Sequence, residues 1–270
     1  MERVRWAFPC AAWRPGRQDW LLAARLVQPE ERDRVRQLVF ARDAKAALAG
    51  RLLIRKLIAE KLWIPWNEIV LQRTSKGKPF LANSISSIHS NFNFNVSHQG
   101  DYAVLAAEPE LQVGIDIMKT SLPGSGSVPD FFRIMKRQFT DAEWGVIESM
   151  NNEWMQLDMF YRHWALKESF IKAIGIGLGF NLQRIEFNAS PLKLEVGKVY
   201  KETKMLLDGD EEEEWTFEVL STELTQPQFT VLTFEDLVAS GIPVSPEDPA
   251  QWDIFCSKQE CPARQSSHSR

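Results

Sequence analysis

Hydrophobic residues in the first third of the chain recur with the spacing of helices. Over residues 43–62, apolar side chains return every three or four positions, and Asp43 is suited to cap the start of this helix. Pro29 is typical of a first helical position and predicts a charged helical stretch that runs to residue 40. The short apolar run 20–24 is predicted to form a strand. The basic residues of the longer helix are expected mostly on a solvated face, and they are Arg51, Arg55, Lys56 and Lys61.

The pattern changes to a period of two between residues 92 and 118. Apolar and polar residues alternate over 92–97, a turn follows, and the apolar stretch 102–107 is predicted to return as a paired strand. Apolar residues at 113, 115 and 117 alternate with Gly114, Asp116 and Met118, which predicts a third strand with an aliphatic face and a face that carries an acid.

The second half repeats this order of helices before strands. Residues 121–129 are rich in Gly, Ser and Pro and are predicted to be a linker. A capping box at 140–143 begins one helix, and a longer helix is predicted over 154–174. The strands expected after it are 185–187, 199–207 and 215–220. We therefore expect an α+β fold of two similar lobes, each with helices on a short antiparallel sheet. Its parts are a lobe at 1–120, the linker, a lobe at 130–240 and an extended or partly disordered tail at 241–270.

Composition narrows the classes of function. The chain has 270 residues, of which 44% are hydrophobic and 25% charged, and this excludes disorder as the main state. The formal net charge of −4 provides no global attraction for nucleic acid or an anionic membrane, so an anionic ligand needs a local basic cluster. The 3 cysteines lack metal-site spacing, and no apolar run is long enough for a membrane span. We expect a cytosolic protein without nucleic-acid or membrane partners.

Glu168 is the most informative position in the predicted helix 154–174. It falls inside the apolar arc of this helix, where an unpaired carboxylate costs several kcal/mol and therefore requires a cation, a metal ion or a proton. An ordinary ion pair with Lys172, one turn further on, explains the position equally well. The residues that define the arc are Leu157, Phe160, Trp164 and Ile171.

A metal site requires a second acid, and Asp116 is the candidate. An aspartate on the open face of a strand is usually only solvated. Together with Glu168 it would form a hard oxygen site for Mg²⁺, which takes one or two carboxylates and leaves other positions to phosphates and water. Gln99 would add a neutral oxygen.

Phosphate groups require cations and backbone N–H groups. Gly77 lies between two lysines and allows the backbone to approach an anion, although such a tripeptide is more often an exposed turn. The glycines at 175–179 follow a helix instead of opening one, which argues against a dinucleotide site. The basic candidates are Arg73, Lys76, Lys78, His98 and Lys172.

Four motifs together resemble those of the 4′-phosphopantetheinyl transferases. They are Val-Gly-Ile-Asp at 113–116, the helix segment 164–172, Lys-Gly-Lys-Pro at 76–79 and Asn-Val-Ser-His at 95–98. The resemblance covers roughly residues 4–220 and is strongest to the larger, monomeric type with two lobes related by a pseudo-two-fold axis. It implies transfer of 4′-phosphopantetheine from coenzyme A to a serine of an apo acyl or aminoacyl carrier protein, with release of 3′,5′-ADP.

The resemblance also implies roles for individual residues. Asp116, Glu168 and Gln99 would hold Mg²⁺, Glu168 would be the general base, and Lys172 would assist at the phosphates. The acidic carrier protein would meet a basic patch of Arg133, Lys136 and Arg137. The implied coenzyme A residues are Arg34, Arg73, Lys76, Gly77, Lys78, Asn95, Val96, Ser97, His98, Glu168, Ser169 and Lys172.

Two departures from the family pattern keep other functions open. Met118 stands where many relatives have another acid, and the chain passes from 218–224 directly to 226–229 where a further apolar strand is expected. The alternative is a non-catalytic variant that binds coenzyme A or a carrier protein and has an incomplete second lobe. A third class, another divalent-metal phosphotransferase or hydrolase, would use the same acids on a different nucleotide.

Overall fold

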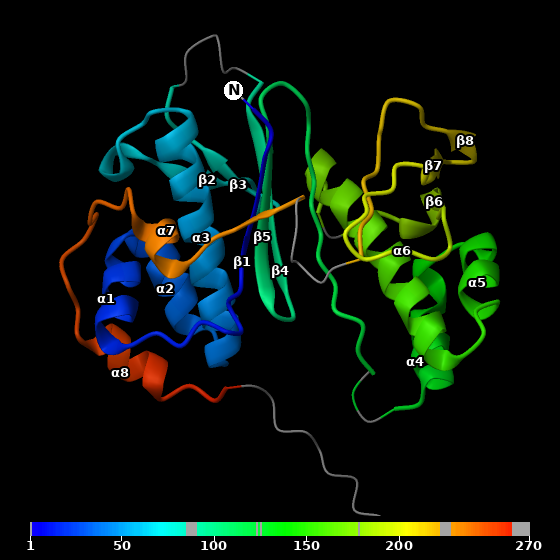
Figure 1. Cartoon of the computed structure of the whole chain (residues 1–270), viewed down its shortest axis with the longest axis horizontal. Helices are drawn as coiled ribbons and strands as arrows, with labels where there is room; N and C mark the ends of the chain where they lie inside the picture. Colours follow the sequence, from blue (N-terminus) through cyan, green and yellow to red (C-terminus); the bar gives the residue numbers. More distant parts are fainter. Residues whose placement is uncertain are drawn as a thin grey trace, which may run out of the picture. The chain divides into compact units, whose positions relative to one another are not determined.

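The computed structural model describes residues 2–84, 91–122, 124, 126–177, 179–221 and 228–260, and Figure 1 labels most of their helices and strands. Contacts divide the chain into two compact units. The first contains Met1–Ile117, Lys172–Gly177 and Phe229–Pro262, and the second contains Met118–Ile171 and Leu178–Gln228. Each unit combines helices with a short sheet, so the predicted α+β class is confirmed.

The first unit is built on a four-stranded sheet of order β4-β5-β1-β9. Strand β1 pairs with β5 in antiparallel fashion and with β9 in parallel fashion, so the last described strand lies beside the first. The strands are β1 (Val4–Phe8), β4 (Asn93–Gln99), β5 (Tyr102–Glu108) and β9 (Thr230–Val231), with a separate hairpin of β2 (Leu71–Arg73) and β3 (Pro79–Leu81).

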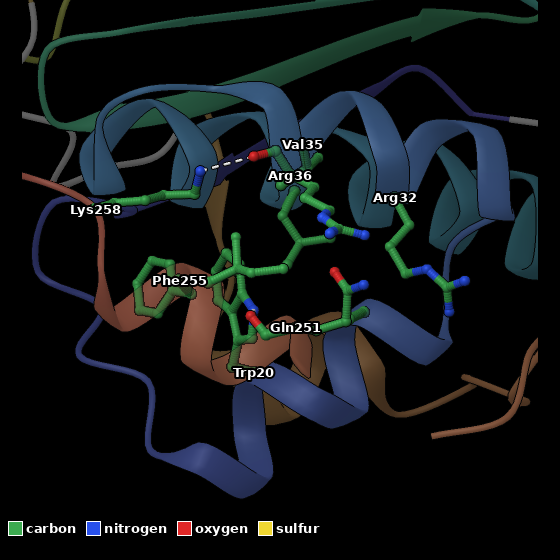
Figure 2. Close-up of a pocket in the computed structure, with 10 residues that line it drawn as sticks. Trp20, Arg32, Val35, Arg36, Gln251, Phe255 and Lys258 are labelled. Carbon is green, nitrogen blue, oxygen red and sulfur yellow. Dashed lines mark hydrogen bonds between the residues drawn. The ribbon is translucent and has the colours of Figure 1, made fainter. Parts of the chain in front are cut away.

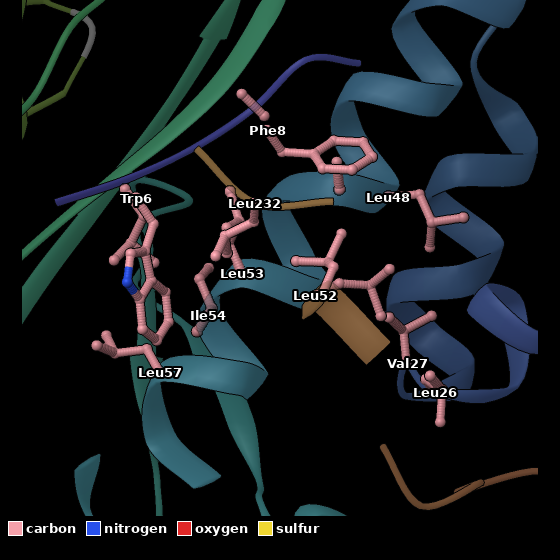
Figure 3. Close-up of a cluster of buried hydrophobic side chains, with 14 of the residues drawn as sticks. Trp6, Phe8, Leu26, Val27, Leu48, Leu52, Leu53, Ile54, Leu57 and Leu232 are labelled. Atoms are coloured by element: carbon pink, nitrogen blue, oxygen red, sulfur yellow. The ribbon is translucent and has the colours of Figure 1, made fainter. Parts of the chain in front are cut away.

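Helix α3 (Ala41–Lys61) packs on β4 and β5 and contributes more buried residues to the core of the first unit than any other described element. Its Ala and Leu content favours a helix, and its leucines meet Trp6, Phe8 and Leu232 (Figure 3). Each fully buried leucine contributes roughly 1.5–3 kcal/mol. The other helices are α1 (Arg17–Arg25), α2 (Pro29–Gln37), the short 3-10 helix η1 (Trp66–Glu68), α7 (Phe234–Val238) and α8 (Ala250–Cys256).

The solvated face expected for the basic residues of α3 is wrong for several of them. Arg55 is buried, donates to the Ile69 carbonyl at 3.3 Å and also donates to the Trp66 carbonyl. Lys56 is buried as well and pairs with Glu60. Arg55 therefore fixes the segment that follows α3, whereas the Lys56 pair lies within the helix.

The strand predicted at residues 20–24 is also wrong, because this run belongs to α1. Trp20, Leu21, Ala23 and Ala24 are buried while Leu22 is exposed, as the rotation of a helix requires. At the start of the helix, Asp19 accepts a hydrogen bond from the Gly16 N–H at 3.0 Å.

The third strand predicted at 113–118 is absent from the described part of the first unit. The N–H of Val113 donates to the Asn93 side chain at 3.2 Å, and the N–H of Ile115 donates to the Asn95 side chain at 2.9 Å. The segment is therefore attached to β4 by side chains and not by a backbone ladder.

The second unit is helical around one aromatic cluster. The long helix predicted at 154–174 is confirmed as α6 (Glu153–Ile174), whose last turn belongs to the first unit. The capping box is confirmed at Thr140 and Glu143. Rings of Phe132, Phe139 and Trp144 pack on Phe160. The other helices are α4 (Val128–Met135), η3 (Lys136–Gln138), α5 (Asp141–Glu148) and η4 (Leu182–Arg184).

The sheet of the second unit is smaller than expected. Its order is β6-β7-β8, where β6 confirms the strand predicted at 185–187 and β7 covers only the end of 199–207. Residues 215–220 form a single bridge, between Tyr200 and Val219, instead of a strand. The place of the missing strand, at 222–227, lies outside the described residues. The strands are β6 (Ile185–Asn188), β7 (Lys204–Leu207) and β8 (Asp210–Glu211).

A buried ion pair joins the helices of the second unit. Lys167 and Glu143 have side chains that are 0% exposed, and Lys167 Nζ lies 2.6 Å from Glu143 Oε2. The same ammonium donates to the carbonyls of Gln138 and Leu182, while Glu143 accepts the N–H of Phe187 at 2.9 Å. The pair therefore links α6 to α5, β6 and both 3-10 helices.

Residues after 241, expected to be extended or partly disordered, include helix α8, which packs on α1. The Trp20 indole N–H donates to the Gln251 carbonyl at 3.1 Å, and its ring stacks on Phe255 at 3.8 Å. Figure 2 shows the narrow pocket between α1, α2 and α8, where Lys258 donates to the Arg36 carbonyl at 2.8 Å. Residues from 261 onward lie outside the described part. Among the described helices, none is long and apolar enough to cross a membrane.

Candidate functional site

Three residues predicted for the site meet in the first unit. Lys172 Nζ forms an ion pair with Asp116 and donates to Ser97 Oγ at 2.9 Å, and Ser97 Oγ donates to Asp116 Oδ1 at 2.9 Å. Lys172 comes from the last turn of α6, Ser97 from β4, and Asp116 from the segment without regular secondary structure that follows β5. The alternative in which Asp116 is simply solvated is wrong, because its side chain is only 6% exposed.

The two carboxylate oxygens of Asp116 have different surroundings. Oδ1 accepts hydrogen bonds from Lys172 Nζ and Ser97 Oγ. Oδ2 is buried and has no hydrogen-bond partner within the described structure. A buried carboxylate oxygen normally has a partner, so Oδ2 is suited to a cation ligand. Magnesium needs only one or two carboxylates, so the residues present fit it. Among the described residues, no three Asp, Glu, His or Cys side chains form a metal cluster.

The backbone of the Asp116 segment is fixed by Asn95. Asn95 is buried in β4, and its side chain receives the N–H of Ile115, the residue next to Asp116. Val96 lies beside it, with its methyl group close to Gly50 of α3. The Asn-Val-Ser-His motif thus acts in part by positioning a carboxylate.

The Lys-Gly-Lys loop is closed by its own hydrogen bonds. The Thr74 N–H donates to the Lys78 carbonyl at 2.9 Å, and the Gly77 N–H donates to the Thr74 carbonyl at 2.8 Å. Gly77 has φ +86°, a conformation that favours glycine. Lys78 Nζ donates to the Ala173 carbonyl at 3.1 Å, and burial lowers its pKa.

Arg73 and Arg34 both contact a glutamate that the motifs do not contain. Arg73 forms two hydrogen bonds to Glu31, and Arg34 Nε lies 3.7 Å from the same carboxylate. Arg51 of α3 also pairs with Glu31. Glu31 and Arg51 were not predicted, because their signal is only two charges on separate helices.

His98 lies at the end of β4 and stays accessible to solvent. Desolvation by the surrounding atoms lowers its pKa, and the positive charges of Arg51 and Lys172 lower it further. The imidazole is therefore biased toward its neutral form until an anion compensates these charges.

The remaining predicted residues are distributed as follows. Glu168 and Ser169 belong to the second unit, and Ser169 donates to the Leu166 carbonyl of its own helix at 2.8 Å. Gln99 pairs with Tyr102 across the β4–β5 turn. None of the residues predicted to bind coenzyme A lines the pocket of Figure 2.

Comparison with known proteins identifies the family of the chain. Residues 11–110 match the family described as 4′-phosphopantetheinyl transferase, N-terminal, and residues 112–233 match the 4′-phosphopantetheinyl transferase superfamily. The chain is 60% identical over 296 residues to the human L-aminoadipate-semialdehyde dehydrogenase-phosphopantetheinyl transferase, with 100% of this chain and 96% of the relative covered.

The chain belongs to the 4′-phosphopantetheinyl transferase superfamily.

Other members of the superfamily also match. The Xenopus laevis relative of the same name is 60% identical, with 98% of this chain and 95% of the relative covered. The Bacillus subtilis 4′-phosphopantetheinyl transferase Sfp is 31% identical over 156 residues, with 58% of this chain and 63% of Sfp covered. The alignment to the human relative is longer than this chain, so the relative has residues there that this chain lacks.

Proposed function

We propose that this chain transfers 4′-phosphopantetheine from coenzyme A to a serine of an apo acyl or aminoacyl carrier protein, with release of 3′,5′-ADP. Membership of the superfamily supports the reaction class. The observation that supports catalysis by this particular chain is the Asp116 carboxylate, which is held at Oδ1 by Lys172 and has an unpartnered, buried Oδ2.

The reaction needs charge compensation and one proton acceptor. The serine oxygen of the carrier attacks the phosphorus attached to pantetheine, the bond to the bridging pyrophosphate oxygen breaks, and that oxygen leaves with 3′,5′-ADP. A bound Mg²⁺ would stabilise the negative charge of the pyrophosphate. Asp116 Oδ2 would hold this ion, and Glu168 and Gln99 are the other oxygen donors proposed from the sequence.

Glu168 is proposed to accept the serine proton on its carboxylate. It lies on the same face of α6 as Lys172, one turn earlier. The preceding Lys167 points about 100° away around the helix. It is held there by the buried pair with Glu143, which fixes the rotation of α6 about its axis. A base whose direction is fixed in this way loses less entropy when it reaches the reacting hydroxyl.

Lys172 and the basic loop would bind the phosphates of coenzyme A. The Lys172 side chain is partly exposed, at 29%, so it can contact a ligand while it pairs with Asp116. Arg73, Lys76 and Lys78 supply further positive charge around the loop, where Gly77 allows close approach of the backbone. Arg34 and His98 complete the proposed set.

The carrier protein is proposed to dock on the second unit at Arg133, Lys136 and Arg137. These residues follow one another on α4 and η3, and Arg133 is exposed. A basic patch would steer an acidic partner. We further propose that the protein acts as a cytosolic monomer.

A binding variant without catalysis remains the second candidate, because this chain lacks residues that the human relative has within the aligned region. One experiment separates the two. Purified protein, coenzyme A, Mg²⁺ and an apo carrier protein should add one phosphopantetheine to the carrier, measured by mass spectrometry, and chelation of Mg²⁺ should stop the addition.

Two variants complete this experiment. Glu168→Ala should abolish the mass gain, while Glu153→Ala, on the exposed first turn of the same helix, should not. Wild-type protein that binds coenzyme A without any mass gain would establish the binding variant. Turnover of a nucleotide that lacks the pantetheine arm would instead establish another phosphotransferase.

A further inference from the structure

Glu31 connects three elements of the first unit that the proposed coenzyme A site depends on. Glu31 Oε1 accepts a hydrogen bond from Arg73 Nε at 2.7 Å, and Glu31 Oε2 accepts one from Arg73 NH2 at 2.6 Å, so the pair is bidentate. Arg51 Nε lies 2.6 Å from Oε2. The three side chains come from α2, β2 and α3, and the Glu31 side chain is only 12% exposed.

The hydrogen bonds of Arg73 leave part of its guanidinium available. A guanidinium has about five N–H donors. Glu31 takes two of them, and NH1 donates a third to the Gly77 carbonyl at 2.8 Å. The other donors remain for a ligand in a fixed plane, which suits the oxygens of a phosphate.

The same arginine fixes the Lys-Gly-Lys loop. By binding the Gly77 carbonyl, Arg73 holds the residue between Lys76 and Lys78 in its left-handed conformation. Glu31 therefore acts on the loop through Arg73, without touching it.

Charge balance favours an anionic ligand at this cluster. Three arginines, Arg34, Arg51 and Arg73, surround one carboxylate, so the cluster keeps an excess of positive charge. Burial tends to raise the pKa of Glu31, but hydrogen bonds and charges from Arg73 and Arg51 outweigh it and lower the pKa. Glu31 therefore stays ionised at neutral pH.

We infer that Glu31 is a positioning residue for coenzyme A binding: it orients Arg73 and Arg51, and through Arg73 the Lys-Gly-Lys loop, for the phosphates of the substrate. This inference rests on the proposed function. Without the carboxylate the cluster would gain net positive charge, but Arg73 would lose its fixed plane. Directional, bidentate hydrogen bonds contribute more to phosphate binding than one additional charge that solvent screens.

The test compares Glu31→Gln with Glu30→Gln, an exposed glutamate one position earlier on the same helix. Coenzyme A binding is measured by calorimetry and carrier modification by steady-state kinetics. For Glu31→Gln we expect the Kd and KM for coenzyme A to rise about tenfold, or about 1.4 kcal/mol, with kcat within about twofold of wild type. Glu30→Gln should match wild type in both assays.

A double variant separates positioning from general damage to the fold. In an Arg73→Ala background, Glu31→Gln should change the Kd for coenzyme A by less than about twofold, because Glu31 acts mainly through the Arg73 guanidinium, which this variant lacks. The inference would be overturned if the losses of affinity from the two substitutions were additive. It would also be overturned if Glu31→Gln alone left the affinity for coenzyme A unchanged, made it tighter, or lowered only kcat.

Inorganic pyrophosphate distinguishes failure of the inferred positioning role of Glu31 from failure of the proposed function. If wild-type protein does not bind coenzyme A, the proposed function fails, and pyrophosphate then tests the cluster alone. Weaker pyrophosphate binding by Glu31→Gln than by Glu30→Gln would support a positioning role for phosphates. Equal binding, or no binding by wild type, would overturn it.

Discussion

Asp116 and Lys172 lie 56 positions apart in the sequence and form a direct ion pair in the first unit. The pair engages only one carboxylate oxygen, so the aspartate is anchored and keeps a second oxygen for a ligand. The Lys172 ammonium also neutralises the carboxylate, which lowers the free-energy cost of burying it when no ion is bound.

Replacement of this carboxylate tests its proposed role. Asp116→Asn keeps the shape of the side chain but removes the charge that Lys172 and a cation require. We expect carrier modification to fall by roughly 10²–10³-fold, the usual effect of removing one preorganised electrostatic group. The loss should be partly recovered at higher Mg²⁺ concentration. Asp210→Asn, on the exposed strand β8, is the control. An unchanged dependence on Mg²⁺ would contradict the metal role.

The attachment of the Asp116 segment predicts a local effect of Asn95. Asn95→Ala removes the acceptor of the Ile115 N–H, so this amide should exchange with solvent at least about tenfold faster. Hydrogen exchange followed by mass spectrometry checks this, with the exposed Asn91→Ala as control. Activity should decline with it because Asp116 is displaced. Unaltered exchange over 113–117 would show that other contacts hold the segment.

The buried pair of the second unit predicts non-additive effects on stability. Lys167→Met leaves Glu143 buried without its cation and should lower the free energy of unfolding by about 3–5 kcal/mol. Adding Glu143→Gln should restore part of this loss, because no uncompensated charge then remains. Chemical denaturation of the two single variants and the double variant measures the coupling. Additive losses would show that the two side chains act independently.

His163 predicts a pH dependence of stability. It is 0% exposed, and burial lowers its pKa from 6.5 to about 4. The unfolded chain therefore binds a proton first, so stability is fully present above pH 6.5 and is lost as the pH falls toward about 4. The loss amounts to roughly 3 kcal/mol.

The variant His163→Phe isolates this contribution because it keeps a ring and removes the titration. Its unfolding free energy should change less between pH 6.5 and 4 than that of wild type, measured by denaturant titration at each pH. Parallel curves for both proteins would assign the pH dependence to other groups.

Long periodic segments were predictable from the sequence, whereas the short segments 20–24 and 113–118 were assigned wrongly. Over the length of α6 the helical period is unambiguous, and the predicted bounds differ from Glu153–Ile174 by one residue. The run 20–24 is too short to distinguish a period of two from the helical period. At 113–118 the alternating pattern predicted a strand, but such a pattern does not show whether N–H groups bond to a neighbouring strand or to asparagine side chains.

The site shows the same limit. Asp116, Ser97 and Lys172 could be proposed because their motifs are specific together, and they do contact one another. Glu31 and Arg51 could not be proposed as site residues, because a charged residue on a predicted helix is usually solvated. Only the packing of α2 against α3 brings these two charges together.

The pairing of β1 with β9 has a consequence for biosynthesis. Strands β1, β4 and β5 leave the ribosome early, but β9 and α8 follow only after the whole segment Met118–Ile171 and Leu178–Gln228. At a synthesis rate of about 5–20 residues per second, the interval is on the order of ten seconds. During this time the edge of β1 and the Trp20 face of α1 are uncovered, so the nascent first unit is an expected client of chaperones while the second unit can already fold.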